Sequence, residues 1–433
     1  MSNFESTQFK NMIKRKVVVS RYFCLHSESI QKKGEFMKIA VIGTSRKENE
    51  KRVAIHPSQI SLIPEEIRSQ LVFEKGYGVD FGMNDDRITS LTGNQPRERK
   101  YLYKNFNAFL ITKPVIEDFK EMKDGSLVWG WVHSVMQEDV AQIAIDKKLT
   151  LIAWENMHYN STRGRTHIFQ KNNEMAGYCG VQHALQLRGI DGNFGADKRV
   201  SILSLGSVSR GSIYALKGHG FEDITVYTRR PSHLVADRLP GVTYRQLTRG
   251  DDNRFMTVNE QGEEISLIEE LAQSDIIVNG VLQDQNNPSI FVTDTDVEKF
   301  ENECLVIDIS CDDRMGFSFA HPTSFEHPLF KVGKITYYSV DHTPTLLWDS
   351  ASWEISKSVL PFLKDVIEQN PNEILDAAVD FRDGIIINQD IITVQNRETV
   401  YPYKRIGIVD APVVKRRSLF RRITDSISPS MRS

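Results

Sequence analysis

Residues 200–212 read VSILSLGSVSRGS, an apolar run that passes directly into a turn of small residues. Small side chains at such a turn let the backbone approach a pyrophosphate, and the helix that follows offers amide donors and the positive end of its dipole. If Gly206 is the second glycine of a GxGxxG fingerprint, Ser204 takes the first position and Ser209 the third, so the match is imperfect. A tight strand-to-helix turn without a ligand is the alternative to a nucleotide site.

Short apolar runs, separated by helix-sized segments, extend on both sides of this turn. Runs of this kind without polar alternation are typical of buried parallel strands in βα units. Two sets of five runs therefore predict an α/β protein with two doubly wound, Rossmann-like parallel-sheet domains and a cleft between them. The runs are 39–42, 71–73, 108–111, 127–132 and 151–154, then 200–205, 224–227, 276–278, 305–309 and 335–340.

An amphipathic helix is expected after Pro344, because apolar residues recur at helical spacing from 355 to 366. Such a helix could carry the chain back to the first domain, which would make that domain discontinuous. The predicted division is a flexible N-terminal extension (1–36), a substrate and catalytic domain (37–165 plus 345–387), a Rossmann NADP-binding domain (166–344) and a polar, basic C-terminal tail (388–433).

Composition excludes several classes of protein. Across 433 residues, 54 Lys and Arg nearly balance 57 Asp and Glu, which argues against a dedicated nucleic-acid binder. No apolar run approaches the ~18 residues of a membrane span, and the stretch 17–19 is too short for a signal-peptide core. The 4 cysteines form no C-x-x-C pair, so neither a zinc site nor a disulfide framework is indicated. A cytoplasmic protein without a metal is expected.

The segment after the run 224–227 indicates which cofactor would bind. An NAD site usually has an acidic residue there to bind the ribose, but this chain has Thr228, Arg229 and Arg230. Two guanidinium groups suit a dianionic 2′-phosphate, so NADP is predicted; a solvated loop with two surface arginines is the alternative. Expected cofactor contacts are Ser204, Gly206, Ser207, Val208, Ser209, Thr228, Arg229 and Arg230.

Several motifs together resemble one family. The chain is similar to the alanine dehydrogenase and transhydrogenase N-terminal superfamily, which includes lysine-forming saccharopine dehydrogenase, over roughly residues 37–385. Within it, residues 279–284 and 340–353 look most like the N5-(carboxyethyl)ornithine synthase branch, whose members condense pyruvate with the side-chain amine of ornithine or lysine and reduce the imine with NADPH. The motifs are RKENEKRVAIHP (46–57), ITKP (111–114), WGWVH (129–133), NNEMAGY (172–178), VIDISCD (306–312) and SVDHTP (339–344).

Three residues of the first domain match catalytic positions of that family. The resemblance implies that Arg52 binds the carboxylate of the keto acid, a role that suits a planar fork of donors. It implies that Lys113 polarises the ketone or imine and that His133 moves protons, and histidine titrates near working pH. Taken singly, each could instead be a surface salt-bridge residue, a solvated loop lysine or a packed core histidine.

Further residues follow from the same resemblance. Asp312 matches a family aspartate near the nicotinamide, and His342 follows the last strand, where the family lines the substrate site. Asn279 opens the branch-like segment and is assigned to cofactor binding, whereas Glu50 is expected to orient Arg52.

The predicted function is an NADPH-dependent reductive condensation that forms an N-(1-carboxyethyl) amino acid. Oxidative deamination of alanine or a saccharopine-type cleavage would keep the enzyme class and change the substrate. A nucleotide-binding relative that has lost catalysis is a third interpretation, supported only by the weakened glycine turn. Small-molecule substrates, no nucleic acid, no membrane and a homo-oligomer are expected, the last by resemblance alone.

Overall fold

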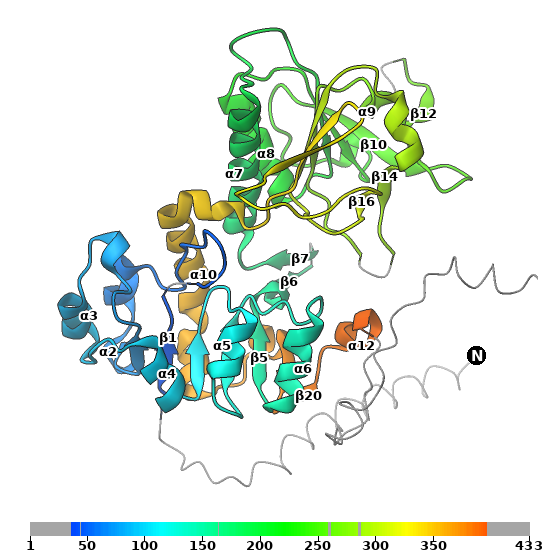
Figure 1. Ribbon diagram of the computed structural model, residues 1–433. Helices are drawn as coiled ribbons and strands as arrows, with labels where there is room; N and C mark the ends of the chain where they lie inside the picture. The colour runs from blue at the N-terminus through cyan, green and yellow to red at the C-terminus, as the bar shows by residue number, and fades with distance from the viewer. Residues whose placement is uncertain (1–35, 44, 163, 259–260, 285–286, 396–433) are drawn as a thin grey trace, which may run out of the picture.

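The computed structural model describes residues 36–395, apart from residues 44, 163, 259–260 and 285–286. The predicted N-terminal extension, up to residue 35, and the predicted basic tail, from residue 396, lie outside the described residues. The described chain forms two lobes, each built around one large mixed sheet with helices packed on it (Figure 1). Within this part of the chain, no helix has the length and apolar character that a membrane crossing needs.

The first sheet has the strand order β2-β1-β3-β4-β5-β19-β20, and its first five strands are parallel. All five apolar runs predicted between residues 39 and 154 are strands of this sheet. They are buried on both faces, which explains their lack of polar alternation. The strands are β1 (Ile39–Val41), β2 (Leu71–Phe73), β3 (Ala108–Leu110), β4 (Leu127–Gly130), β5 (Thr150–Ala153), β19 (Val379–Arg382) and β20 (Ile385–Ile386).

The second sheet has the order β12-β11-β10-β9-β8-β13-β15-β18-β17, with six parallel strands from β10 to β18 at its centre. This is the doubly wound order of a dinucleotide-binding fold. The five predicted runs of the second set are again all strands. The strands are β8 (Val200–Leu203), β9 (Ile224–Thr228), β10 (Thr243–Arg249), β11 (Phe255–Val258), β12 (Glu264–Ser266), β13 (Ile276–Asn279), β15 (Cys304–Asp308), β17 (Leu329–Val332) and β18 (Ile335–Tyr338).

The remaining elements cover these sheets or join them. Around the first sheet lie η1 (Pro57–Leu62), α2 (Glu65–Arg68), η2 (Val79–Phe81), α3 (Asp85–Thr92), α4 (Arg99–Asn105), α5 (Ile116–Glu121), α6 (Glu138–Asp146), η3 (Trp154–Asn156), β6 (His158–Ser161), β7 (Gly164–His167), α11 (Glu373–Ala377) and α12 (Gln389–Gln395). With the second sheet go α7 (Gln170–Arg188), α8 (Ser207–Gly218), η4 (Ser232–Leu234), α9 (Leu267–Leu271), β14 (Ile290–Val292), η5 (Asp294–Lys299) and β16 (Gly316–Phe317).

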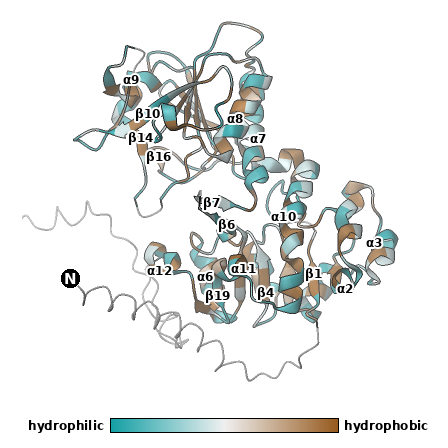
Figure 2. Cartoon of the chain, turned by 180° about the vertical axis from the view of Figure 1, so that it is seen from behind, coloured by the Kyte–Doolittle hydropathy of each residue, from teal (hydrophilic) through white to brown (hydrophobic). Residues whose placement is uncertain are grey.

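After the second sheet the chain returns to the first lobe through η6 (Thr343–Leu347) and α10 (Trp348–Glu368), as Figure 1 shows. The apolar residues of α10 that the spacing predicts, from Ile355 to Val366, share one buried cluster with Ile39 and Val41 of β1. Beyond α10, strand β19 pairs antiparallel with β5. Figure 2 shows the same arrangement from behind, with hydrophobic and hydrophilic residues alternating along α10.

Helix α12 differs from the sequence expectation for this region. Residues 388–395 read as the start of the polar tail, yet α12 packs on the first lobe and Ile391 is fully buried. Ile391 belongs to the apolar cluster on the α5 and α6 side of the sheet. The packed first lobe therefore extends to at least residue 395.

Helices α7 and α8 are in close contact at two glycines. A Cβ atom added to Gly211 would lie 1.7 Å from the carbonyl oxygen of Glu174, and one added to Gly177 would lie 1.9 Å from that of Val208. Neither position accepts a side chain without a shift of backbone. The contact fixes α8, the helix that follows the small-residue turn, against the helix that enters from the first lobe.

Candidate active site between the two lobes

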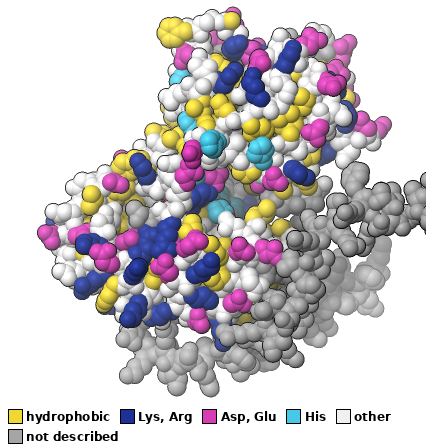
Figure 3. Space-filling view, viewed as in Figure 1, with side chains coloured by type: hydrophobic (Ala, Val, Ile, Leu, Met, Phe, Trp, Pro, Cys, Tyr) yellow, Lys and Arg dark blue, Asp and Glu magenta, His cyan; other side chains and the backbone are white. Residues whose placement is uncertain are grey.

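The first sheet reverses its strand order between β1 and β3, and ligands of open α/β sheets bind at such a reversal, beyond the carboxyl ends of the strands. The loop after β3 carries Lys113, and Ser45, in the loop after β1, donates from Oγ to the Lys113 carbonyl oxygen at 2.7 Å. Gly130, at the end of β4, lies so near β3 that an added Cβ would be 1.9 Å from the Ile111 carbonyl oxygen. The ends of β1, β3 and β4 therefore meet at one edge. On the face seen in Figure 3, the space between the lobes is hollowed and histidine side chains lie around it.

Lys113 lies at this edge with a side chain that is 12% exposed. Its Nζ is 3.8 Å from Oδ2 of Asp341. Burial and the positive charge of Lys47 lower the pKa of Lys113 to about 8, although Asp341 opposes the shift. A lysine with a pKa near the working pH can both polarise a carbonyl and exchange a proton.

His133 follows β4 and has a left-handed backbone, with φ of 51°, which is uncommon for a residue other than glycine. Its backbone N–H donates to Oε1 of Glu155 at 2.6 Å, and its Nδ1 lies 3.9 Å from the same oxygen. Burial lowers the pKa of His133 to about 3, and the charges of Lys113 and Lys47 add to the shift. The ring is 39% exposed, so solvent offsets part of the burial, but the nearby cations support the direction. His133 is therefore a neutral base at this edge.

Glu155 is a candidate that the sequence analysis missed. It lies two residues after the end of β5, and burial together with the charge of Asp380 raises the pKa of Glu155 to about 8. Oε2 of Glu155 is buried and accepts no hydrogen bond from the described residues. Its place at the carboxyl end of a buried strand was the available signal, because Lys113 and His133 follow β3 and β4 in the same way.

Lys47 and Asp341 are two further charged residues that the sequence analysis did not single out as site residues. The Lys47 ammonium and the His342 Nδ1 both contact the Asp341 carboxylate. Burial opposes ionisation of Asp341, but the His342 contact and the charges of Lys113 and Lys47 lower its pKa well below the usual range. Asp341 therefore stays ionised and joins the loop after β1 to the segment that returns to the first lobe.

His342, predicted to contact substrate, has both ring nitrogens engaged in this conformation. Besides the Asp341 contact, Nε2 lies 2.8 Å from the carbonyl oxygen of Glu48, and the side chain is only 4% exposed. In this arrangement His342 braces the loop that carries Lys47.

Arg52 is buried, with a side chain only 2% exposed. Its Nε and Nη2 donate to the Glu50 carboxylate at 2.8 and 2.5 Å, which is the contact expected if Glu50 orients it. Nη1 donates to Oδ1 of Asn172 at 3.0 Å, and the guanidinium carbon lies 5.1 Å from the centre of the Trp131 ring. Three donors of the guanidinium are thus engaged, and its remaining N–H groups are those that a carboxylate could use.

The second edge, at the carboxyl ends of β8 and β13, is shaped by backbone more than by charge. Ser204 has φ of 80°, the conformation that glycine favours, at the position where the fingerprint has its first glycine. Gly206 caps α8, and beyond its two chain neighbours the nearest described atom to a Cβ added there would be the Ser204 Oγ, at 4.0 Å. Ser207 and Val208 open the helix, and the buried Ser209 donates from Oγ to the Leu203 carbonyl oxygen at 3.4 Å.

This turn fits a dinucleotide. The space above Gly206 is open, and the first backbone N–H groups of α8 have no partner within the helix, as at any helix N-terminus. At the end of β9, Thr228 is buried, whereas Arg229 and Arg230 are exposed. The exposed pair suits an anionic group at the outer end of the ligand.

Asn279, predicted to bind the cofactor, is fully buried at the end of β13. Its Nδ2 donates to Oδ1 of Asp308 at 3.0 Å, and its Oδ1 accepts from the Val281 N–H at 3.2 Å. Burial raises the pKa of Asp308 to about 7, and the half-buried Asp312 adds to the shift by its charge. Asn279 thus supports the loops at this edge, and Asp312 is the more accessible of the two predicted groups.

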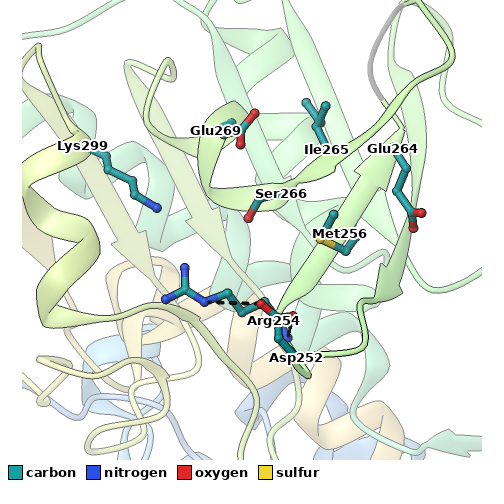
Figure 4. Close-up of a pocket in the computed structure, with 8 residues that line it drawn as sticks. All are labelled: Asp252, Arg254, Met256, Glu264, Ile265, Ser266, Glu269 and Lys299. Carbon is teal, nitrogen blue, oxygen red and sulfur yellow. Dashed lines mark hydrogen bonds and ion pairs between the residues drawn. The ribbon is translucent and has the colours of Figure 1, made fainter.

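A polar hollow of about 470 Å³ lies elsewhere, at the outer edge of the second sheet (Figure 4). Its lining comes from β11, β12 and their neighbours, and within it Arg254 lies 3.9 Å from Asp252. None of the predicted site residues lines it. The eight lining residues are Asp252, Arg254, Met256, Glu264, Ile265, Ser266, Glu269 and Lys299.

Two doubly wound sheets, a charged edge on the first and a fingerprint-like turn on the second define a two-domain protein with a Rossmann-like fold. Comparison with known proteins agrees. Residues 235–395 match the family model described as "Alanine dehydrogenase/PNT, C-terminal domain". The N(5)-(carboxyethyl)ornithine synthase of Clostridium botulinum is 24% identical over 357 residues, which cover 78% of this chain and 96% of that protein. The alanine dehydrogenase of Bacillus subtilis is 22% identical over 338 residues, covering 74% and 84%.

Solved structures share the fold. An L-alanine dehydrogenase superposes with a TM-score of 0.64 at 17% identity, covering 83% of this chain and 99% of that one. The transhydrogenase of Sinorhizobium meliloti gives 0.61 at 16% identity, covering 81% and 99%. The predicted resemblance is therefore confirmed: the chain is similar to proteins of the alanine dehydrogenase and transhydrogenase superfamily in sequence and in fold.

Proposed function

We propose that the chain is an NADPH-dependent enzyme that condenses a 2-oxo acid such as pyruvate with the side-chain amine of ornithine or lysine and reduces the resulting imine. The product would be an N-(1-carboxyethyl) amino acid. The observation that carries the proposal is the group of ionisable side chains at the first edge, where Lys113 has a pKa lowered to about 8 and His133 one lowered to about 3. Relatives named for carboxyethylornithine synthesis favour this reaction among those of the superfamily.

The chemistry needs a held keto acid, a polarised carbonyl and a base. We assign the keto-acid carboxylate to the remaining N–H groups of Arg52 and the carbonyl oxygen to the Lys113 ammonium. His133 is neutral, so it can take the proton that the amine loses as its nitrogen attacks the ketone carbon. The Lys113 ammonium can protonate the oxyanion that forms, and His133 can then return its proton to the resulting hydroxyl, which leaves as water as the protonated imine forms.

NADPH, when bound, supplies the hydride that reduces the imine carbon. On the protein side, Ser204, Gly206, Ser207, Val208 and Ser209 would hold its pyrophosphate by backbone and small side chains. Thr228, Arg229 and Arg230 would bind the adenosine end, with the two arginines on the 2′-phosphate. Asp312 would face the nicotinamide, supported by the loop that Asn279 and Asp308 fix.

The test is a panel assay on the purified full-length chain. The protein would be given NADPH or NADH, with pyruvate or 2-oxoglutarate, and with ornithine, lysine or ammonia, and products would be identified by mass spectrometry. We expect an N-(1-carboxyethyl) product from pyruvate with ornithine or lysine, formed faster with NADPH. Alanine from ammonia would indicate an alanine dehydrogenase, and saccharopine from 2-oxoglutarate and lysine would indicate the saccharopine-type reaction. If the protein bound the cofactor but formed no product, the proposal that it is an enzyme would be wrong.

We also propose that the chain forms a homo-oligomer and acts in the cytoplasm on small molecules. The first point follows from the resemblance to the superfamily alone, and the absence of a membrane-spanning helix among residues 36–395 is compatible with the second. Sedimentation velocity would give the assembly size, and a monomer at all concentrations would contradict the first expectation.

A further inference from the structure

The loop that carries His133 is held by residues more than 240 positions away in the sequence. Oγ of Ser134 donates to Oδ2 of Asp380, which lies on β19. Nε2 of Gln395, the last residue of α12, donates to the carbonyl oxygens of Ser134 and Val135 at 2.7 Å each. The segment 379–395 thus contacts the loop directly after the candidate base.

Asp380 also reaches the second acidic group of the site. Its Oδ1 accepts from Nδ2 of Asn156 at 2.8 Å, and Asn156 is the residue after Glu155. Asn388 donates to the same oxygen at 2.8 Å and closes the network from the α12 side. One carboxylate therefore bonds both to the neighbour of His133 and to the neighbour of Glu155.

Burying the Asp380 carboxylate lowers the stability of the fold unless other groups compensate for the lost hydration. It is fully buried, and the free energy of burying a carboxylate is recovered only when hydrogen bonds satisfy it. Three side chains donate hydrogen bonds to it, those of Ser134, Asn156 and Asn388, and all three are neutral. Burial raises the pKa of Asp380, and its charge in turn acts on Glu155.

The backbone of His133 needs such support. A left-handed φ on a residue with a side chain costs about 1 kcal/mol or more and persists only where surrounding contacts fix it. The Glu155 carboxylate holds the His133 N–H, Asp380 holds the Ser134 hydroxyl, and Gln395 holds the carbonyl groups of Ser134 and Val135. If these contacts were lost, the ring would be expected to leave its place beside Lys113.

We propose that Asp380, with Gln395, is a positioning residue of the candidate active site: from β19 and α12 it fixes the His133–Val135 loop relative to Glu155 and so holds the His133 ring beside Lys113. The proposal rests on the proposed function, because positioning His133 matters for catalysis only if His133 carries protons in the reaction.

The test reads His133 directly and needs no substrate. In full-length protein with ¹³C-labelled histidine, the ring signal of His133 is assigned by its loss in the His133→Asn variant. We expect no titration of this signal between about pH 5 and 8 in the native chain, whereas Asp380→Ala should bring the midpoint up toward the ordinary value of about 6.5. Asp380→Asn should restore native behaviour, because its amide can still accept from Asn156 and Asn388 and can donate to Ser134 Oγ.

A matched control is Asp383→Asn, which changes an exposed aspartate in the turn after β19 and should leave His133 unchanged. If Asp380→Ala does not fold, Ser134→Ala and Gln395→Ala each remove part of the same network and should raise the His133 midpoint partway. In an active enzyme we expect Asp380→Ala to lower kcat by about tenfold or more without a change in the KM for NADPH.

An unchanged His133 titration in a folded Asp380→Ala variant would overturn the proposal, and so would unchanged titrations in both Ser134→Ala and Gln395→Ala. Failure of the panel assay to give any product would overturn the proposed function alone, because the titration reports the position of His133 whether or not the reaction occurs.

Discussion

The carboxyl edges of the two sheets are built in opposite ways. At the first edge, ionisable side chains lie close enough to change one another's protonation, as Lys47 and Lys113 do for His133. At the second edge, the features that matter are a left-handed Ser204, a bare Gly206 and glycines packed against backbone. The comparison teaches that the first edge should respond to charge and pH, whereas the second should respond to volume and backbone shape.

The largest effect is expected at the first edge. Replacing His133 with Asn keeps a polar side chain but removes the base, and should lower kcat by about 10²–10⁴-fold, the usual range for a lost acid–base group. Steady-state kinetics with NADPH titration would measure it, and cofactor affinity should be unchanged. His321→Asn, an exposed histidine of the other lobe, is the control. Near-normal turnover in a folded His133→Asn variant would leave His133 as a packing residue only.

The next largest effect is expected at the second edge, where the charge of two arginines should determine the choice of cofactor. Changing Arg229 and Arg230 together to Gln should shift the preference between NADPH and NADH by well over tenfold, because each charge-assisted phosphate contact is typically worth about 1.5–3 kcal/mol. The ratio of kcat/KM for the two cofactors is the measurement. Arg188→Gln, at an exposed position in the last turn of α7 and so toward the opposite edge of the sheet, should leave the ratio unchanged. A native chain that uses both cofactors equally would refute the assignment.

A pair of alanine substitutions in α8 tests the role of volume. Gly211→Ala places a Cβ against the Glu174 carbonyl and should lower stability by about 1–3 kcal/mol, because the helices must separate. Gly218→Ala, at the last residue of the same helix, meets no atom within 4 Å and should be neutral or slightly stabilising. Denaturant unfolding of both variants gives the comparison. Equal stability would show that α7 and α8 can move apart freely.

The smallest effect is a pH dependence at the first edge. The pKa of Glu155 is raised to about 8, so its contribution to stability is full below its ordinary pKa and is lost as the pH rises through about 8. Glu155→Gln keeps the acceptor for the His133 N–H and cannot ionise. Between pH 5 and pH 9, the free energy of unfolding should therefore fall by about 1–3 kcal/mol less in the variant than in the native chain. The control Glu66→Gln changes an exposed residue and should show the same pH dependence of stability as the native chain. If the native chain and both variants had the same pH dependence, the shifted pKa of Glu155 would be contradicted.

The fold was predictable from the sequence in those segments where burial requires a continuous run or a regular spacing of apolar residues. The ten continuous apolar runs became parallel strands, and α10 was visible from its apolar spacing. The strands that were missed carry polar residues for tertiary reasons. Strand β10 contains Arg245, which is buried by an ion pair with Glu270 at 2.8 Å, and β19 contains the hydrogen-bonded Asp380. A window of sequence cannot show that such a polar residue has a distant partner.

The candidate site was predictable to a similar degree. The sequence motifs were sufficient to name Lys113 and His133 as site residues, and their roles remain predictions. Glu155 and Asp341 matter because of what faces them, and those partners come from other strands. For the same reason the engaged rings and amides of His342 and Asn279 could not be anticipated.

The late return of the chain to the first sheet has a consequence for synthesis on the ribosome. Strand β5 ends at Ala153, but β19, its neighbour, begins only at Val379. At about 5–20 residues per second, some 10–45 s separate their emergence, and the second lobe is complete in the meantime. During that interval the nascent first lobe has an unpaired β5 edge and lacks the α10 surface that covers β1. The lobe encoded first is thus the one that finishes folding last, and it is the one that needs protection from aggregation while it waits.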